Sequence, residues 1–352
     1  MGYILLRIFS AFFLFATYFP KVKLDYWWIR IFDYPRLQKL TVLLGLIGCW
    51  TFTLGMESNL ESYSWISALA ISSIYLTTKV WPFSPLGKKM IKTVPYNEEA
   101  GINILVGNVY QYNKSFSKAV ALVKEVNPDL IFFVETDKAW ENGLSEIEKD
   151  YATQIKIPLD NTYGLLLYTR MEIVRQEINY LIDEEVPSLE IDVKLRNGEI
   201  ITIYAIHPTP PVPGENDKST ERDAEILLVG KKSKENNKPS LVIGDLNDVA
   251  WSYTTELFLK NSEMADPRRG RGLFNTFHAK IPLLRWPLDH IFLSKHFGLA
   301  SIQVQDVIGS DHFPISLKAV LTPTEDTETI EANREEKQEA REKISRGLNE
   351  ED

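Results

Sequence analysis

Two short polar motifs contain the residue types needed for acid–base or metal chemistry, and each adjoins an apolar run. Gly309-Ser310-Asp311-His312 precedes the run 313–321, and Gly244-Asp245-Leu246-Asn247 follows the run 241–243. An imidazole can take a proton from water near neutral pH, and a neighbouring carboxylate can bind a metal or orient the ring. Either motif alone is weak evidence, because loops often contain such triplets.

The same kinds of side chain recur at four other places next to apolar runs. Asn108 follows the run 102–106, Glu135 follows 129–134, His207 follows 203–206, and Asp289 precedes 291–293. Any one of them fits a turn or a cap equally well. Together, the six places supply only carboxylate, amide and imidazole groups, which are what a hard divalent ion and a water nucleophile require.

The elements that must position these residues are those of a soluble α/β or α+β domain between residues 101 and 321. Short apolar runs and Gly, Pro and Asn punctuation predict strands, and apolar spacing of three or four residues predicts helices. We expect strands at 102–106, 129–134, 164–168, 189–195, 200–206, 240–243, 288–293 and 313–321, and helices at 115–126, 137–150, 220–232 and 254–260.

The first 83 residues differ from the rest because they contain three long apolar runs, 3–20, 40–56 and 62–83. Each is about as long as the roughly 17 to 25 residues that cross a bilayer. Buried core helices are the alternative. Lys and Arg occur in the loop between the first two runs and again after the third run. The positive-inside rule therefore places the N-terminus outside and the residues after 84 in the cytoplasm. Trp27-Trp28-Ile29 fits a segment lying at the lipid headgroups.

The sequence therefore divides into four parts: three transmembrane helices at 1–83, a linker at 84–100, a catalytic domain at 101–322 and a charged tail at 323–352. The tail has few large apolar residues, so we expect disorder or a solvated helix. The net charge is −9, most of it in the tail, which only mildly disfavours a nucleic-acid substrate. With Cys49 as the single cysteine, no intrachain disulfide is possible.

The order of Asn108, Glu135, His207, Gly244–Asn247, Asp289 and Ser310–His312 resembles the endonuclease/exonuclease/phosphatase superfamily, which includes deoxyribonuclease I, exonuclease III, neutral sphingomyelinases and inositol polyphosphate 5-phosphatases. The segment 285–290 is similar to the bacterial membrane-anchored branch of that superfamily. The resemblance implies a four-layer α/β/β/α sandwich that hydrolyses phosphate esters with Mg²⁺ or Mn²⁺. Gly107 and Val134 depart from residues that many relatives have beside the metal.

The resemblance also implies roles for individual residues. Glu135, Asn108 and Asp311 would hold the metal, and Asp289 would orient the ring of His312. Either Asp245 or His312 would deprotonate the attacking water, and the two alternatives stay open. Asn247 and His207 would donate hydrogen bonds or a proton to the phosphate. His290, adjacent to Asp289 in a strand, should point to the opposite face and be structural.

A basic loop, Arg268-Arg269-Gly270-Arg271, follows Asp266 and has two interpretations. Guanidinium groups suit bidentate contacts with phosphate, which would give the loop a role in substrate binding. The alternative is a solvated turn or a charge partner for Asp266.

These features predict a Mg²⁺-dependent phosphoesterase integral to the bacterial inner membrane. The partners expected are the lipid bilayer and a phosphate-ester substrate, and no protein partner can be inferred. We expect nuclease-like phosphodiester hydrolysis slightly ahead of action on phospholipid, inositol phosphate or sphingomyelin. A non-catalytic membrane scaffold is the alternative of another class, and the loss of a catalytic group would support it.

Overall fold

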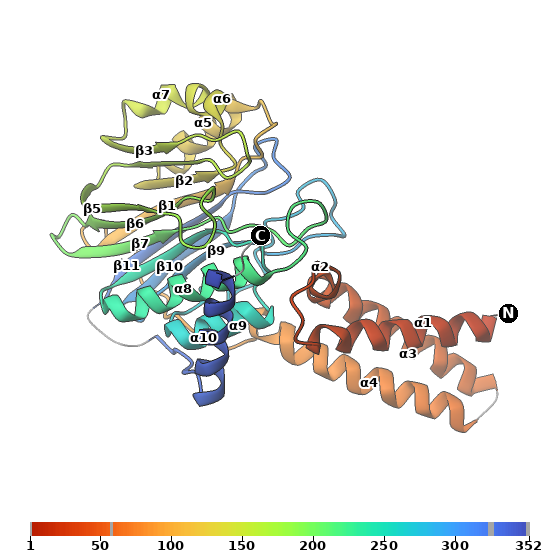
Figure 1. The fold of residues 1–352 in the computed structure, drawn as a ribbon. Coiled ribbons are helices and arrows are strands. Elements are labelled where there is room, and N and C mark those ends of the chain that lie inside the picture. The colour runs from red at the N-terminus through yellow and green to blue at the C-terminus, as the bar shows by residue number, and fades with distance from the viewer. Residues whose placement is uncertain (1, 57–58, 323–326, 350–352) are drawn as a thin grey trace.

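The computed structural model describes residues 2–56, 59–322 and 327–349. Two β-sheets lie face to face, helices cover their outer sides, and a group of long helices from the N-terminal part extends from one side of this sandwich (Figure 1).

The first sheet has the strand order β10-β11-β1-β2-β4-β3. Near its centre, β1 pairs in parallel with β2 and antiparallel with β11. The strands are β1 (Gly101–Asn108), β2 (Leu130–Val134), β3 (Thr153–Ile157), β4 (Leu165–Thr169), β10 (Phe297–Val304) and β11 (Ile315–Leu321).

The second sheet has the order β5-β6-β7-β8-β9, with β7 and β8 parallel and the other pairs antiparallel. Its strands are β5 (Glu172–Asn179), β6 (Ser188–Lys194), β7 (Ile200–Ala205), β8 (Ser240–Asp245) and β9 (Asp289–Leu293).

Alternate residues of the strands fill the space between the sheets, because successive strand side chains point to opposite faces. In β1 the inner residues are Ile102, Ile104 and Val106, and they meet residues of the other sheet such as Ile203 and Ile243. All five are fully buried. This alternation is the reason that the apolar runs of the sequence are strands rather than helices.

The outer faces of the sheets carry separate apolar layers under the helices. The first sheet is covered by α5 (Phe116–Val126), α6 (Lys138–Gly143) and α7 (Ser145–Glu148). The second is covered by α8 (Thr220–Asn236), α9 (Tyr253–Ser262) and α10 (Arg334–Asn349). The order helix, sheet, sheet, helix confirms the predicted four-layer α/β/β/α sandwich.

The charged tail differs from the prediction of disorder or a solvated helix. Residues 323–326 and 350–352 lie outside the described residues, but 334–349 form α10, which packs on α8 and α9. Ala340 and Ile344 join the apolar layer, and Ala224 lies against Gly347. The buried ammonium group of Lys343 pairs with Asp25 and Asp223, both at 2.9 Å. Contacts with distant parts of the chain thus order a segment that is too polar to fold by itself.

The N-terminal part consists of α1 (Gly2–Tyr18), the short α2 (Trp27–Arg30), α3 (Arg36–Met56) and α4 (Leu60–Val80), with 3₁₀ turns at Phe19–Lys21, Ile31–Asp33 and Trp81–Phe83. The three long helices pack together through residues such as Leu43, Trp50, Leu69 and Leu76. Among the described residues, two helices are long and apolar enough to cross a membrane, Gly2–Lys21 and Arg36–Gly55. Core helices of soluble proteins and signal sequences can have the same length and composition. The third predicted span, 62–83, corresponds to α4, which is not among these two helices.

The segment expected to be a linker is partly built into the core. Met90 and Ile91 are buried between the sheets, and Thr93 forms a parallel bridge with Leu299 of β10. Residues 84–100 therefore fix the N-terminal helices against the sandwich rather than connecting them loosely.

Candidate active site

Six predicted positions meet at one end of the sandwich because of the strand directions. Asn108 ends β1, Glu135 follows β2, His207 follows β7, and Asp245 ends β8. The strands β9 and β11 run antiparallel to β8 and β1, so their beginnings reach the same end. Asp289 pairs directly with Asp245 in the sheet, and His312 lies just before β11.

The side chain of Asn108 connects the two sheets at this end. Its Nδ2 donates to Glu135 Oε1 at 2.6 Å and to Asp245 Oδ2 at 3.1 Å. Its Oδ1 accepts from the backbone N–H of Tyr110 at 2.9 Å. Asn108 is therefore held on both sides, and it sets the spacing between the carboxylates of Glu135 and Asp245.

His312 lies between two buried carboxylates. Its Nδ1 is 2.8 Å from Asp289 Oδ2, and its Nε2 is 3.5 Å from Asp245 Oδ2. The backbone of His312 is fixed as well, because Ser310 Oγ accepts from its N–H at 3.0 Å and donates to the carbonyl of Asn108 at 2.8 Å. The arrangement is an imidazole with one nitrogen anchored by Asp289 and the other directed at Asp245.

Burial and charge set the protonation states of this group. Burial lowers the pKa of His312, but Asp289 and Asp245 outweigh this effect and raise it to about 10. Burial raises the pKa of Asp245, but the charge of His312 and hydrogen bonds from Asn247 and Asn108 bring it below its usual value. At neutral pH the geometry therefore favours an imidazolium beside an ionised Asp245.

The pKa of Glu135 is shifted in the opposite direction to that of Asp245, and its carboxylate is in contact with Asn108 and Gln111. Burial, together with the charges of Asp245 and Asp311, raises the pKa of Glu135 to about 7, against the lowering effects of Asn108 and His312. Its backbone has φ +56°, a left-handed conformation that is costly for a residue other than Gly or Asn. In this conformation the carboxylate accepts from Asn108.

The Gly-Asp-x-Asn motif forms a tight turn at the end of β8. Gly244 has φ +142°, and a Cβ there would lie 1.8 Å from the carbonyl oxygen of Ile206, so only glycine fits. Asn247 has φ +50°, its N–H donates to Asp245 Oδ1 at 3.0 Å, and its Nδ2 donates to the carbonyl of Pro208 at 3.0 Å. The turn thus brings Asp245 and Asn247 to the same end of the sheet, with Asn247 half-exposed.

His207 is buried near Asp245 and His312, and its imidazole is neutral at pH 7. Burial lowers the pKa of its imidazole to about 4, although Asp245 opposes this effect. Its Nδ1 is buried and has no hydrogen-bond partner in the part of the chain that the structure describes. Its ring centre lies 5.6 Å from that of Tyr163. A neutral imidazole can donate one hydrogen bond, which suits a phosphoryl oxygen.

Two sets of side chains could hold a metal. Asp245, Asp289 and His312 have ligand atoms within 4.8 Å of one another, but Asp289 and His312 are already bonded to each other. The other set is the predicted one of Glu135, Asn108 and Asp311, in which both carboxylates are half-exposed and therefore accessible. Carboxylate and amide oxygens fit Mg²⁺ or Mn²⁺, and the charges of Asp245 and Asp311 add to the effect of burial in raising the pKa of Glu135.

The basic loop and His290 are structural. Arg268 forms a buried ion pair with Asp266 at 2.8 Å, and its Nη2 lies 2.6 Å from His290 Nδ1. His290 Nε2 lies 2.8 Å from the carbonyl of Asp248. Arg269 pairs with Glu256 at 2.7 Å. The structure thus agrees with the second interpretation of the loop, and His290 points away from the site as predicted.

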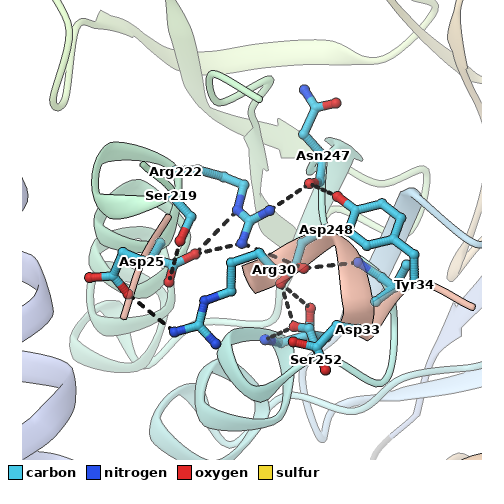
Figure 2. A network of polar contacts seen from close by, with 12 residues as sticks. Asp25, Arg30, Asp33, Tyr34, Ser219, Arg222, Asn247, Asp248 and Ser252 are labelled. Atoms are coloured by element: carbon cyan, nitrogen blue, oxygen red, sulfur yellow. Dashed lines mark hydrogen bonds and ion pairs between the residues drawn. The ribbon is translucent and has the colours of Figure 1, made fainter. Parts of the chain in front are cut away.

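Three residues near the site were missed in the sequence. Gln111 has its N–H 3.4 Å from Glu135 Oε2, and its Nε2 donates to the carbonyl of Asp160 at 3.0 Å. The carbonyl of Asn247 accepts from Arg222 Nη1 at 2.8 Å and from Tyr34 Oη at 2.9 Å (Figure 2). Gln111 lies three residues after Asn108, a signal that was available. Tyr34 lies more than 200 residues before Asn247 and had no such signal.

A large cavity lies elsewhere. It has a volume of about 1230 Å³ and lies between the ends of the N-terminal helices, α9 and α10, with none of the eight predicted site residues in its lining. Some of its charged residues are paired with one another, for example Lys23 with Glu339 and Lys260 with Glu336. The convergence of buried carboxylates and imidazoles, rather than cavity size, identifies the candidate active site.

Comparison with known proteins identifies the family of the chain. The model of the endonuclease/exonuclease/phosphatase family matches residues 102–312, more than half of the chain, and the chain therefore belongs to this family. Members of the family hydrolyse phosphoester bonds and generally depend on a divalent metal. No curated protein matches the chain significantly.

Solved structures show the same fold at low identity. The human nocturnin catalytic domain has a TM-score of 0.51 at 13% identity, covering 64% of this chain and 96% of that one. TDP2 of D. rerio complexed with single strand DNA product has 0.50 at 17%, covering 62% and 99%. The Bacteroides thetaiotaomicron mannosyl-6-phosphatase has 0.50 at 16%, covering 62% and 100%.

Proposed function

We propose that this protein is a membrane-anchored, divalent-metal-dependent phosphoesterase whose catalytic centre is the group of Asn108, Glu135, His207, Asp245, Asn247, Asp289, Asp311 and His312. The observation that carries the proposal is the chain of contacts from Glu135 through Asn108 and Asp245 to His312 and Asp289, all at one end of the sandwich. Three carboxylates, an amide and an imidazolium there match the requirements of hydrolysis at phosphorus.

Glu135, Asn108 and Asp311 would hold Mg²⁺ or Mn²⁺. The bound ion would polarise a phosphoryl oxygen and stabilise the negative charge that develops as water attacks. A cation beside Glu135 would also return its raised pKa toward the ordinary range, because it replaces repulsion from Asp245 and Asp311 with attraction.

The remaining residues divide the proton transfer and the binding of phosphate. Asp245 is ionised and directed toward His312, so it is the group that can accept a proton from water. His312, held protonated by Asp289, offers positive charge to the phosphate. His207, which is neutral, and the amide of Asn247 can each donate a hydrogen bond to a phosphoryl oxygen. Of the two alternatives for the base, this assignment favours Asp245.

Both phosphodiesters and phosphomonoesters remain consistent with the fold, since one structural neighbour holds a DNA product and another is named a mannosyl-6-phosphatase. The test of function therefore uses one generic substrate of each type. The full-length chain, purified in detergent, is assayed with bis(p-nitrophenyl) phosphate and with p-nitrophenyl phosphate, in Mg²⁺, in Mn²⁺ and in excess chelator.

Two variants and a control complete the test. Asp245→Asn and His312→Gln should each lower turnover at least about 100-fold, the usual cost of removing a general base or a charge-stabilising donor. Glu199→Gln is the matched control, because this exposed carboxylate lies at the opposite end of the second sheet, before β7. Retention of activity by both site variants would reject the proposed centre. Inactivity of the native chain on both substrates would favour the scaffold alternative.

A further inference from the structure

The catalytic centre lies at the end of the sandwich from which the N-terminal helices extend. The segment between α1 and α3 makes direct contacts with the loop after β8: Tyr34 donates to the carbonyl of Asn247, and Trp251 Nε1 donates to the carbonyl of Asp33 at 2.9 Å. Figure 2 shows the hydroxyl of Tyr34 directed at the backbone oxygen of Asn247. We call residues 244–247 the catalytic turn. This turn is therefore in contact with the segment that precedes the proposed membrane helix α3.

A second loop joins the mouth of the site to α3 itself. We call residues 280–285 the rim loop. Just before the rim loop, the backbone N–H of Ala279 donates to the carbonyl of Asp311 at 2.6 Å, and the ring of Phe277 lies 4.9 Å from that of His312. At its tip, the carbonyl of Leu283 accepts from Gln38 Nε2 at 2.8 Å. The rim loop thus spans from the catalytic residues to the first turn of α3.

The rim loop combines exposed apolar side chains with cationic ones. Its side chains Ile281, Leu283 and Leu284 are exposed, and Leu283 is 80% exposed. Lys280 and Arg285 flank them in the sequence. Apolar residues between cations are typical of segments that insert into the boundary between headgroups and acyl chains of anionic lipid.

The position of the rim loop matches that boundary. Gln38 is the third residue of α3, so its Cα lies only about 3 Å along the helix from Arg36 at about 1.5 Å per residue. The rest of α3 leads away from the sandwich toward its other end (Figure 1). If α3 crosses a bilayer, the exposed leucines lie where its near surface begins. Exposed Trp28, Ile31 and Trp81 occur close to the same ends of the N-terminal helices.

We infer that the active site opens onto the bilayer surface, with the rim loop in contact with lipid, and that the substrate is a phosphate ester carried by a membrane lipid. The inference rests on the proposed function and names its substrate class. Nucleic acid is the competing class, but a mouth bordered by exposed aliphatic side chains offers little to a phosphate backbone, which is bound mainly by cations and polar donors.

The first experiment measures the depth of the rim loop without requiring any substrate. Because Cys49 is the single cysteine, Cys49→Ser gives a background for one labelled position at a time. Leu283→Cys is labelled with an environment-sensitive fluorophore and placed in nanodiscs that contain anionic phospholipid and a nitroxide quencher, either near the headgroup or deep in the acyl chain. Leu44→Cys, an exposed site in α3, reports whether the helices are in the bilayer. Val174→Cys, an exposed site on edge strand β5, reports the solvent value.

Three outcomes are distinguishable. Quenching at 283 mainly by the shallow nitroxide, at 44 mainly by the deep one, and at neither depth for 174 supports the inference. Quenching at 44 while 283 behaves as 174 does would overturn the inference and leave the membrane anchor in place. Absence of quenching at 44 would overturn the anchor, and the inference with it.

The second experiment tests the substrate class. The reconstituted chain is given phosphatidic acid as a lipid monoester, phosphatidylglycerol as a lipid diester, and plasmid DNA. We expect hydrolysis of at least one lipid, and we expect Leu283→Gln to lower it at least fivefold while leaving hydrolysis of soluble bis(p-nitrophenyl) phosphate unchanged. Val174→Gln should change neither. Cleavage of DNA with neither lipid hydrolysed, or an equal loss on lipid and soluble substrate, would refute the inference; inactivity on every substrate would instead refute the proposed function.

Discussion

The hydroxyl of Tyr34 offers the sharpest test of how the N-terminal segment contributes to catalysis. Together with Arg222, it fixes the carbonyl of Asn247, at 2.9 Å and 2.8 Å respectively (Figure 2). Tyr34→Phe removes one neutral hydrogen bond and leaves the charged one from Arg222. The carbonyl is therefore not left without a donor, so the variant should fold.

The magnitude follows from that single bond. A neutral intramolecular hydrogen bond contributes about 1 kcal/mol, and about 1.4 kcal/mol corresponds to a tenfold change in rate. If the bond holds Asn247 in its left-handed conformation (φ +50°), its loss should lower kcat roughly threefold to tenfold. KM should change little, because a misplaced amide weakens stabilisation of the transition state more than binding of the substrate.

The assay compares steady-state kinetics with urea unfolding of the same preparations. Tyr253→Phe is the matched control: its hydroxyl donates to Glu339 Oε2 at 2.7 Å, between α9 and α10, and touches no predicted site residue. Tyr34→Phe should lose about 1 kcal/mol of unfolding free energy, and Tyr253→Phe, whose bond is to a carboxylate, about 1.5 to 3 kcal/mol, but only Tyr34→Phe should lower kcat. Equal kcat values in the two variants would show that Tyr34 merely stabilises the fold.

Other perturbations have equally definite expected results. Burial raises the pKa of Glu225 to about 8 in the folded state, so the free energy of unfolding should decrease as pH rises from about 4.5 to 8. The decrease should be a few kcal/mol at most, and Glu225→Gln should remove it. Urea unfolding of both proteins at pH 5 and pH 8 measures the difference. Lys343→Met should lower the unfolding free energy, by at most about 3 to 5 kcal/mol, because Asp25 and Asp223 each lose one buried cationic partner and keep their arginine partners; wild-type stability would contradict this. Glu135→Gln should weaken activation by Mg²⁺ at least about 10-fold, and an unchanged Mg²⁺ titration would exclude Glu135 as a ligand.

The sequence predicted the central strands, and the polar residues at their ends, because these depend on local patterns. Continuous apolar runs such as 102–106 and 129–134 are long enough to be buried strands, and the polar residue that ends each run is placed by the direction of its strand. The structure brings together all six places, and the link through Asn108 accounts for their closeness.

The edge strands were missed for a physical reason. β5 (Glu172–Asn179) is charged and mostly exposed, and its pairing with β6 decides its conformation more than its own sequence does. The strand β3 and most of β10 are also only partly buried. The segment 137–150, predicted as one helix, is divided into α6 and α7 at Leu144. Such elements are fixed by contacts that a local pattern does not contain.

The boundaries of the catalytic domain illustrate the same limit most clearly. The sequence placed them at 101 and 322, but Asp25 from the N-terminal segment accepts ion pairs from Lys343 at 2.9 Å and Arg346 at 3.0 Å, both in α10. Lys343 also pairs with Asp223, which in turn pairs with Arg222 at 2.8 Å. Arg222 donates to the carbonyl of Asn247. This network connects both ends of the chain to the catalytic turn.

A fragment of residues 101–322 would therefore keep Asp223 and lose the ammonium group that neutralises it. Attraction to Lys343 and Arg222 holds the pKa of Asp223 well below its usual range against the effect of burial, so this carboxylate contributes stability above pH 4 that is lost as pH falls. Without Lys343, part of that contribution disappears at every pH above 4. We expect the fragment to unfold at lower urea than the full chain and at higher pH on acidification. Identical unfolding of the two would show that the ends of the chain do not support the catalytic turn.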